Sequence, residues 1–228
     1  MAMHAAELWR YPVKSMAGER LSCVEVTGDG LAGDRRVAVF DRRGSRPDHP
    51  LSARHHPGLL HFRATLAPGG PLVEGPGLAA TRWGQPEVRE RVSIHCGREL
   101  ELAEVPQGAF DDSAVHVLGL ASVRKLAREL GWAVDHRRFR ANVYLEGQGL
   151  EPDSEPSWAG EQFDLGGATL SVAAGCPRCA ITTRNPDTTE AAPGLLRHLV
   201  QTRDALMGAY CLVTSPGRIV EGDQLAWG

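Results

Sequence analysis

The first hundred residues alternate short apolar segments with turn residues. Apolar residues occupy every second position across 60–66, with polar residues between them, and this spacing predicts a strand with one buried face. The segment 37–40 is apolar at every position, which favours a strand that is buried on both faces. Clusters of glycine, proline and charged residues separate such segments and supply the turns.

Two later segments carry apolar residues at helical spacing. The first covers 121–130 and ends before Gly131, a common stop signal. Its apolar face consists of Val123, Leu126, Ala127 and Leu130. The second is predicted to begin at Pro193, because proline suits the first helical turn, and to run to about residue 206. Its apolar face consists of Leu195, Leu196, Leu199 and Val200.

Further short strands are predicted around these helices. They cover 143–145, 168–174, 180–183 and 210–213. The segment 147–157 contains two prolines and is interpreted as a surface loop. Many short strands with few helices are typical of a β-rich α+β fold. The best candidate boundary between two units lies at 107–109, just before Asp111.

The composition of the 228 residues excludes several classes of protein. Hydrophobic residues make up 42% and charged residues 23%, a balance typical of globular rather than disordered chains. The net charge of −3 lacks the basic surplus expected of a nucleic-acid binder. We see no signal-peptide pattern and no apolar run of the roughly 20 residues that a membrane span needs. Five cysteines, an odd number, favour free thiols in a reducing cytoplasm.

A Cys-x-x-Cys pair, Cys176 and Cys179, is the most informative feature of the sequence. A structural zinc site needs four ligands, and no second pair of this kind accompanies it. A thioredoxin-like dithiol needs a helix that starts at the first cysteine, whereas Ala-Ile-Thr-Thr after Cys179 favours a strand. Two interpretations stay open at this point. One is a buried structural pair, and the other is an exposed thiolate whose ionised form is favoured by Arg178 and Arg184.

The residues around Cys179 resemble a family signature. The pattern Arg178-Cys179-x-x-Thr182-Thr183-x-x-Pro186-Asp187-Thr188 is similar to that of MOSC-domain proteins (molybdenum cofactor sulfurase C-terminal domain). It is closest to the branch that contains the mitochondrial amidoxime-reducing component and its bacterial counterparts. The resemblance implies that Cys179 binds the molybdenum of a molybdenum cofactor, with Arg178 and Thr182 beside it. It also implies that Cys176 is not a metal ligand.

Further segments agree with this family in order and spacing, so the resemblance covers nearly the whole chain. They are Tyr-Pro-Val-Lys-Ser at 11–15, Gly-Asp-Arg at 33–35, Ala-Arg-His-His-Pro at 53–57 and Phe-Arg-Ala-Asn-Val at 139–143. The cofactor-binding residues that the resemblance implies are Lys14, Ser15, Arg35, Arg54, Ser113, Arg140, Asn142, Arg178 and Thr182. It also implies two interlocked, mostly antiparallel β-barrel-like units with a few helices. These are a shortened N-terminal barrel at 1–108 and a MOSC domain at 109–228.

The physical chemistry of a pterin phosphate fits these roles. Several charge-assisted donors hold a phosphate better than one, so we expect Lys14, Arg35 and Arg140 to converge on one cleft. Cys179 should line the same cleft at the start of a strand, with its sulfur accessible, and Cys176 should be more buried. A soft thiolate is a suitable ligand for a metal that also carries sulfur ligands.

Two features depart from the family pattern. Asp112 stands where the reductases carry a neutral Ser or Thr, and its carboxylate would repel a phosphate unless it were turned away or paired. The region 102–111 is shorter than in the reductases, and a helix that helps to wall their substrate side is expected to be missing. The histidine cluster at 49–56 lacks the further ligand that a metal site needs. Asp111 beside Asp112 fits a capped turn better than a catalytic pair.

The function that the resemblance implies is oxidoreduction with molybdenum cofactor. We expect an enzyme that transfers an oxygen atom, by reducing N-oxygenated small molecules or in a related reaction. The sequence contains no flavin or iron–sulfur motif, so electrons would come from a separate donor of the ferredoxin or flavoprotein type. We expect no nucleic-acid or membrane partner. The alternative is a carrier or transferase of molybdenum cofactor or persulfide sulfur that uses Cys179, and a third hypothesis is a cofactor-free binding module.

Overall fold

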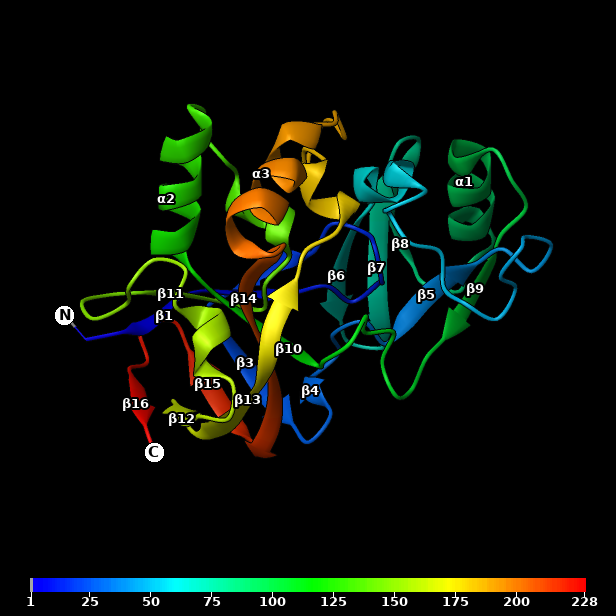
Figure 1. Cartoon of the computed structure of the whole chain (residues 1–228). Helices are drawn as coiled ribbons and strands as arrows, with labels where there is room; N and C mark the ends of the chain where they lie inside the picture. The colour runs from blue at the N-terminus through cyan, green and yellow to red at the C-terminus, as the bar shows by residue number, and fades with distance from the viewer. Residues whose placement is uncertain (1) are drawn as a thin grey trace.

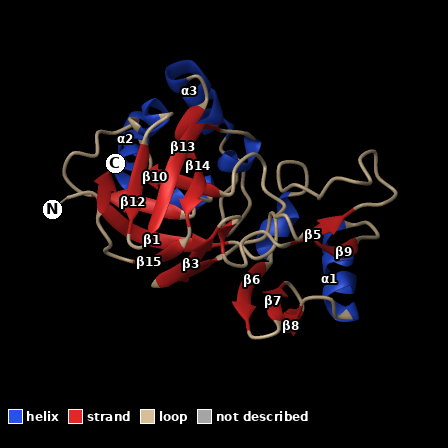
Figure 2. Cartoon of the chain, turned by 90° about the horizontal axis from the view of Figure 1, so that it is seen from below, coloured by secondary structure: helices blue, strands red, loops and turns tan. Residues whose placement is uncertain are grey.

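A large curled sheet is the main element of the computed structural model, which describes residues 2–228 (Figures 1 and 2). In spatial order its strands are β16 (Leu225–Trp227), β12 (Gln162–Leu165), β13 (Ala168–Pro177), β14 (Leu206–Ser215), β10 (Val115–Gly119), β11 (Val143–Glu146), β1 (His4–Arg10) and β2 (Glu19–Leu21). Neighbouring strands are antiparallel except β10 and β11, which are parallel. Successive side chains of a strand point to opposite faces, and nearly all residues of β10 and β11 are buried. Both faces of this sheet are therefore covered.

A three-stranded sheet closes the inner face of the large sheet. It consists of β15 (Gly217–Val220), β3 (Cys23–Thr27) and β4 (Gly30–Leu31). Val143 and Leu145 point inward and share one buried cluster with Val26 and Ile219 of this smaller sheet. The side chain between them, Tyr144, points to the opposite face.

Two helices cover that opposite face (Figure 1). They are α2 (Leu120–Leu130) and α3 (Pro193–Arg203). Leu126 of α2 and Leu199 of α3 are fully buried in a cluster with Tyr144. Each such leucine contributes about 2 kcal/mol by leaving water. Both helices were predicted, and α3 ends earlier than expected because Asp204 adopts a left-handed conformation that caps it.

The second unit lies beside the first and has its own core (Figure 1). β5 (Val37–Phe40) pairs antiparallel with the distant β9 (Glu101–Glu104), and a meander contains β6 (Arg63–Ala67), β7 (Gly70–Gly75) and β8 (Leu78–Arg82). A helix, α1 (Pro86–Cys96), packs Val88 and Val92 against this unit.

The chain passes between the two units, so they are interlocked. Strands β1 to β4 belong to the sheets of the first unit, β5 to β9 form the second unit, and β10 to β16 return to the first. Ala5 and Leu8 are fully buried in the same cluster as Leu170 of β13. The expectation of two interlocked, β-rich, mostly antiparallel units is therefore confirmed. The division of the chain at 108 and 109 stays a prediction.

Four local expectations are wrong. The strand placed at 60–66 begins only at Arg63, because a 3-10 helix occupies Pro57–His61. The strand placed at 180–183 is a 3-10 helix, Ala180–Thr183. Helix α1 was not predicted at all. The supposed surface loop 147–157 buries Glu155, whose carboxylate accepts hydrogen bonds from the Gly119 amide at 2.7 Å and the Ser122 hydroxyl at 2.6 Å.

Within residues 2–228, no helix is both long enough and apolar enough to cross a bilayer.

Candidate functional site

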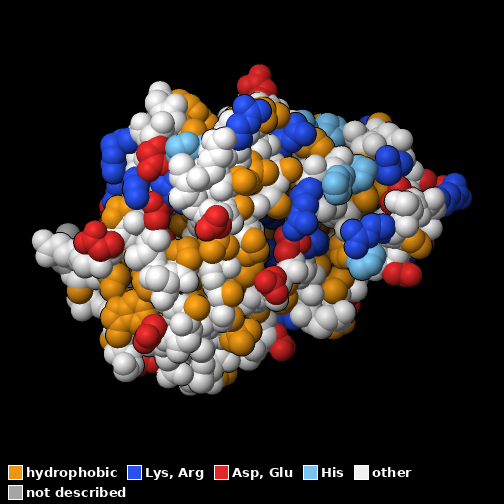
Figure 3. Space-filling model, in the orientation of Figure 1, with side chains coloured by type: hydrophobic (Ala, Val, Ile, Leu, Met, Phe, Trp, Pro, Cys, Tyr) orange, Lys and Arg blue, Asp and Glu red, His pale blue; other side chains and the backbone are white. Residues whose placement is uncertain are grey.

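A polar cleft lies where the two units meet, and charged side chains gather there (Figure 3). We call it the cofactor cleft, after the role that the sequence resemblance predicts for it, and its space, counted with the open mouth, is about 660 Å³. Among the residues that line it are Lys14, Ser15, Arg35, Arg54, Ser113, Arg140, Asn142, Arg178 and Cys179. Sequence reasoning named all of these. Segments that are far apart in the chain thus meet at one place.

Thr182 is the one predicted site residue that does not line the cleft. It is fully buried, and its hydroxyl donates to the Cys179 carbonyl at 2.9 Å. Thr183 does the same to the Ala180 carbonyl at 2.7 Å. These local bonds favour a helical turn over the predicted strand. Thr182 therefore shapes the backbone that carries Cys179 rather than facing the cleft.

The two cysteines differ in exposure. Cys176 lies within β13 and is only 1% exposed. Cys179 is partly exposed, lines the cleft and precedes the 3-10 helix. It follows the end of a strand rather than starting one, because the chain leaves β13 at Pro177. The expected contrast between an accessible and a buried sulfur is present.

The cations around the two sulfurs are not the pair expected from the sequence. Arg178 approaches the buried sulfur, with Nη1 2.7 Å from Cys176 Sγ. Arg54 faces Cys179 instead: burial lowers the pKa of its guanidinium, and its interactions with Cys179 and Asp111 raise it. Arg184 lines a neighbouring pocket and not this cleft.

A carboxylate at the mouth of the cleft holds two of its cations. Asp111 lies 2.8 Å from Lys14 Nζ and 3.2 Å from Arg54 Nη2. Burial lowers the pKa of Lys14, and the Asp111 carboxylate opposes this effect. Asp112 is exposed and does not line the cleft, so the repulsion considered for it does not arise.

Two arginines deeper in the cleft are fixed by the backbone. Arg35 pairs with the fully buried Asp34 and donates to the Arg140 carbonyl at 3.2 Å. Arg140 donates to the Met16 carbonyl at 2.8 Å, and burial lowers the pKa of its guanidinium to about 10. The two guanidinium carbons lie 4.9 Å and 4.2 Å from the ring centroid of Tyr11.

Three residues of the cleft adopt left-handed backbone conformations that non-glycine residues rarely take. Ser15, Arg35 and Arg140 have φ angles of 69°, 52° and 55°. Each such residue costs about 1 kcal/mol or more and persists where the surrounding structure enforces it. Such strain in three separate segments that meet at one cleft is typical of a functional site.

Sequence reasoning missed His116 on the floor of the cleft. It is 5% exposed, and its Nε2 lies 3.4 Å from Arg178 Nη1. Burial and the Arg178 charge hold the pKa of His116 well below its usual range, so the imidazole is neutral at pH 7. Its strand partner Tyr210 packs on it edge-on, with ring centroids 5.8 Å apart. The signal in the sequence that could have identified His116 is that it is the single polar residue in the otherwise apolar strand 115–119.

The hydrogen-bond donors of the cleft suit a bound anion, whereas the protein side chains alone do not form a complete metal site. Within residues 2–228, no three His, Cys, Asp or Glu side chains gather as a metal site. Arg140 Nη2 and Arg178 Nε are buried in the described chain without a hydrogen-bond partner. Unpaired buried donors are costly, and a bound phosphate with polar neighbours would satisfy them.

Comparisons with known proteins agree with this geometry. The MOSC domain model matches residues 82–226, and the model of the MOSC N-terminal beta barrel domain matches residues 2–112. The human mitochondrial amidoxime-reducing component 1 is 26% identical, over 96% of this chain and 81% of the relative. The rat mitochondrial amidoxime reducing component 2 is 23% identical, over 80% of this chain and 67% of the relative. The YuaD protein of Bacillus subtilis shares the fold, with a TM-score of 0.55 at 16% identity over 99% of this chain and 94% of that one.

Proposed function

The chain belongs to the MOSC-domain family, and from that premise we propose that it is a molybdenum-cofactor-dependent oxidoreductase. Its substrates would be N-oxygenated small molecules, from which an oxygen atom is removed, or it would catalyse a related oxygen-atom transfer. The observation that carries the proposal is the convergence of a partly exposed cysteine and five basic side chains on one cleft. These are Lys14, Arg35, Arg54, Arg140 and Arg178. The distant relatives named above are amidoxime-reducing components.

The residues of the cleft divide the work of binding. Lys14 and Arg54 hold the anionic group of the cofactor near the mouth, and Arg140 holds it deeper in the cleft. Cys179 supplies the thiolate ligand for the metal. The cofactor, when bound, supplies the two-electron redox chemistry. Asn142 links its own segment to β10, because its Oδ1 accepts a hydrogen bond from the His116 amide at 3.1 Å.

Buried neutral groups complete the floor of the cleft. His116 stays neutral beside Arg178, so the floor adds no second full charge to those of the arginines. Electrons arrive from a separate donor protein of the ferredoxin or flavoprotein type. All five cysteines, each within the described residues, are free thiols, which supports a reducing cytoplasm as the compartment of action.

Metal and pterin analysis of the purified protein tests the proposal. We expect about one molybdenum and one pterin per chain after expression in a host that makes the cofactor, and neither from a host that cannot. Cys179→Ser should lose molybdenum and lower the reduction of an amidoxime, driven by a chemical electron donor, by at least about 100-fold, because it removes the soft ligand. Cys176→Ser is the matched control and should keep most activity. A folded protein without molybdenum, or full activity in Cys179→Ser, would overturn the proposal.

The second candidate is a carrier of cofactor or persulfide sulfur. The observation that favours it is the partial exposure of Cys179 in an open cleft, which would let another protein reach the sulfur. The same preparations separate the two candidates. A persulfide on Cys179, seen by mass spectrometry in a protein that holds no molybdenum, supports the carrier.

A further inference from the structure

A second pocket lies on the other side of Arg140 and Ile181, which line both cavities. We call it the aromatic pocket, and its space, counted with the open mouth, is about 480 Å³. Its walls come from β1 and the residues after it, from the start of β6 and the segment before it, from residues 137–140, and from residues 181–187 after Cys179. None of its other lining residues is among those assigned to the cofactor.

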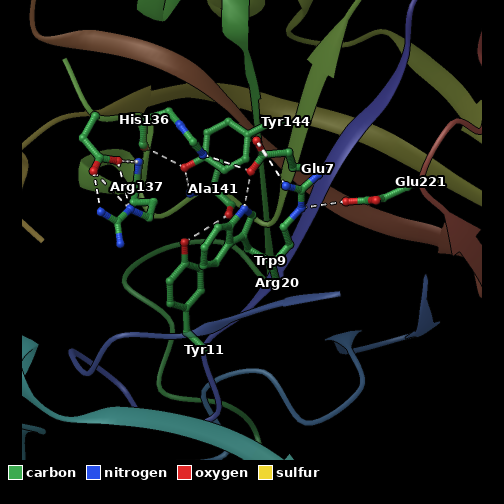
Figure 4. Close-up of polar contacts among 10 residues, drawn as sticks. Glu7, Trp9, Tyr11, Arg20, His136, Arg137, Ala141, Tyr144 and Glu221 are labelled. Carbon is green, nitrogen blue, oxygen red and sulfur yellow. Dashed lines mark hydrogen bonds and ion pairs between the residues drawn. The ribbon is translucent and has the colours of Figure 1, made fainter. Parts of the chain in front are cut away.

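One wall of the aromatic pocket is a rigid pair of aromatic rings (Figure 4). Trp9 and Tyr11 are stacked, with ring centroids 6.5 Å apart and an angle of 18° between the planes. Trp9 Nε1 donates to Glu7 at 2.7 Å, and His136 lies 3.0 Å from the same carboxylate oxygen. Figure 4 shows the polar contacts that link Trp9, Glu7 and His136. The pocket therefore presents a preformed flat surface, suited to a planar ring.

The pocket also gathers arginines with few carboxylates. Five arginines line it, together with one carboxylate, Asp187. Asp187 already forms an ion pair with Arg137, because it and Asp135 each lie 2.6 Å from Arg137 Nη2. The other four are Arg63, Arg138, Arg140 and Arg184, and within residues 2–228 none of them has an ion-pair partner.

One of these four arginines is buried at a cost. Arg138 is 7% exposed and donates to the Thr183 carbonyl at 2.9 Å, while its Nε has no hydrogen-bond partner in the described chain. Burial lowers the pKa of its guanidinium. A buried cation without a counter-charge is unfavourable, and a bound anion would offset that cost. Arg63 and Arg184 are the more accessible cations at the rim.

We propose that the aromatic pocket binds a small planar aromatic or heteroaromatic molecule that carries one anionic group. The ring lies against Trp9, whose stacked partner and polar bonds keep it in place. The anionic group, a carboxylate or a phosphate, binds the unpaired arginines, of which Arg184 contributes directly. This site shares Arg140 and Ile181 with the cofactor cleft but does not depend on the proposed oxidoreductase activity.

Calorimetric titration with four probes tests the proposal. Benzoate and phenyl phosphate combine ring and charge, benzamide keeps the ring without the charge, and inorganic phosphate keeps the charge without the ring. We expect at least one of the first two to bind with a Kd below about 1 mM, and benzamide and inorganic phosphate to bind at least about tenfold more weakly. The stronger of benzoate and phenyl phosphate identifies the anionic group. Equal binding of benzoate, phenyl phosphate and benzamide would overturn the proposal.

Variants place the binding at this pocket. Arg184→Ala should weaken the better probe by about tenfold, and Trp9→Leu should do so by removing the flat surface. Arg89→Ala, an exposed arginine of α1, is the matched control and should change nothing. The indole N–H signal of Trp9 in NMR spectra of the wild type should shift on binding, and the dispersion of the amide signals shows whether each variant is folded. Unchanged affinity in a folded Arg184→Ala protein would overturn the proposal.

The outcome is independent of the proposed function. Arg184→Ala should retain the molybdenum content of the wild type, since Arg184 does not line the cofactor cleft. A protein that loads molybdenum but binds neither aromatic anion loses only the inference about this pocket. A protein that binds benzoate but holds no molybdenum loses only the oxidoreductase proposal.

Discussion

The cofactor cleft and the aromatic pocket share a wall, yet they are built in different ways. The cleft carries polar side chains on strained turns, and Asp111 pairs with two of its cations. The aromatic pocket combines two stacked rings with five arginines, of which only Arg137 has carboxylate partners within residues 2–228. Both cavities form where distant segments pack together, but only the cleft has several of its residues on strained turns with their own backbone geometry. The residues of a short motif can therefore be predicted from the sequence, whereas the lining of a pocket that has no such motif cannot.

Among the changes that compare the two cavities, removing the shared arginine is expected to have the largest effect. Arg140 lines both cavities and has a φ of 55°, so Arg140→Gly removes the side chain without adding backbone strain. We expect molybdenum content and benzoate affinity to fall together, each by about 30-fold, because both anions lose a buried donor. Arg63→Ala, which changes the aromatic pocket alone, is the control. A loss confined to one cavity would show that Arg140 does not serve both.

The two sulfurs offer a smaller but direct contrast. Cys179 opens into the cofactor cleft, whereas Cys176 is 1% exposed behind it. Iodoacetamide should therefore modify Cys179 at least about tenfold faster than Cys176 in the cofactor-free protein. Peptide mass spectrometry over a time course gives both rates. Benzoate should leave the Cys179 rate unchanged if the cavities are separate, and protection by benzoate would mean that they communicate.

The parts of the fold that the sequence predicts are those with a complete local signal. Helix α2 has a full apolar stripe that ends at Gly131, and its buried residues include Val123 and Leu126. Helix α1 buries only Val88 and Val92, so its stripe is too thin to stand out from its charged residues. The proline at its start and the glycine at its end were the remaining signals.

The candidate site shows the same division. Motif residues such as Lys14 and Arg35 were identified because the short segments that carry them resemble motifs of the MOSC family. The turn at Ala180–Thr183 was read as a strand, since β-branched residues favour strands until their hydroxyls bond to nearby carbonyls. Trp9 and Arg184 meet only through tertiary packing, so nothing in the local sequence pairs them.

The smallest predicted effect concerns the carboxylate that distinguishes the cleft from the pocket. Asp111 is 48% exposed and pairs with Lys14 and Arg54, so it competes with any incoming anion. Asp111→Asn should tighten the binding of sulfate to the cofactor-free cleft by about threefold at low salt, a modest gain because solvent screens the pair. Asp112→Asn is the matched control and should have no effect, since Asp112 faces solvent outside the cleft.

The pH dependence of that difference follows from the pKa of Asp111. Burial would raise this pKa, but the Lys14 and Arg54 cations lower it below the ordinary value. A depressed carboxyl pKa means that the charge is fully present above the unfolded pKa of about 4 and is lost only as the pH falls through the folded value. Wild type and Asp111→Asn should thus differ by a constant factor from about pH 5 to pH 8 and converge only in stronger acid. Convergence near neutral pH, measured by sulfate titration at several pH values, would contradict the pairing of Asp111 with these cations.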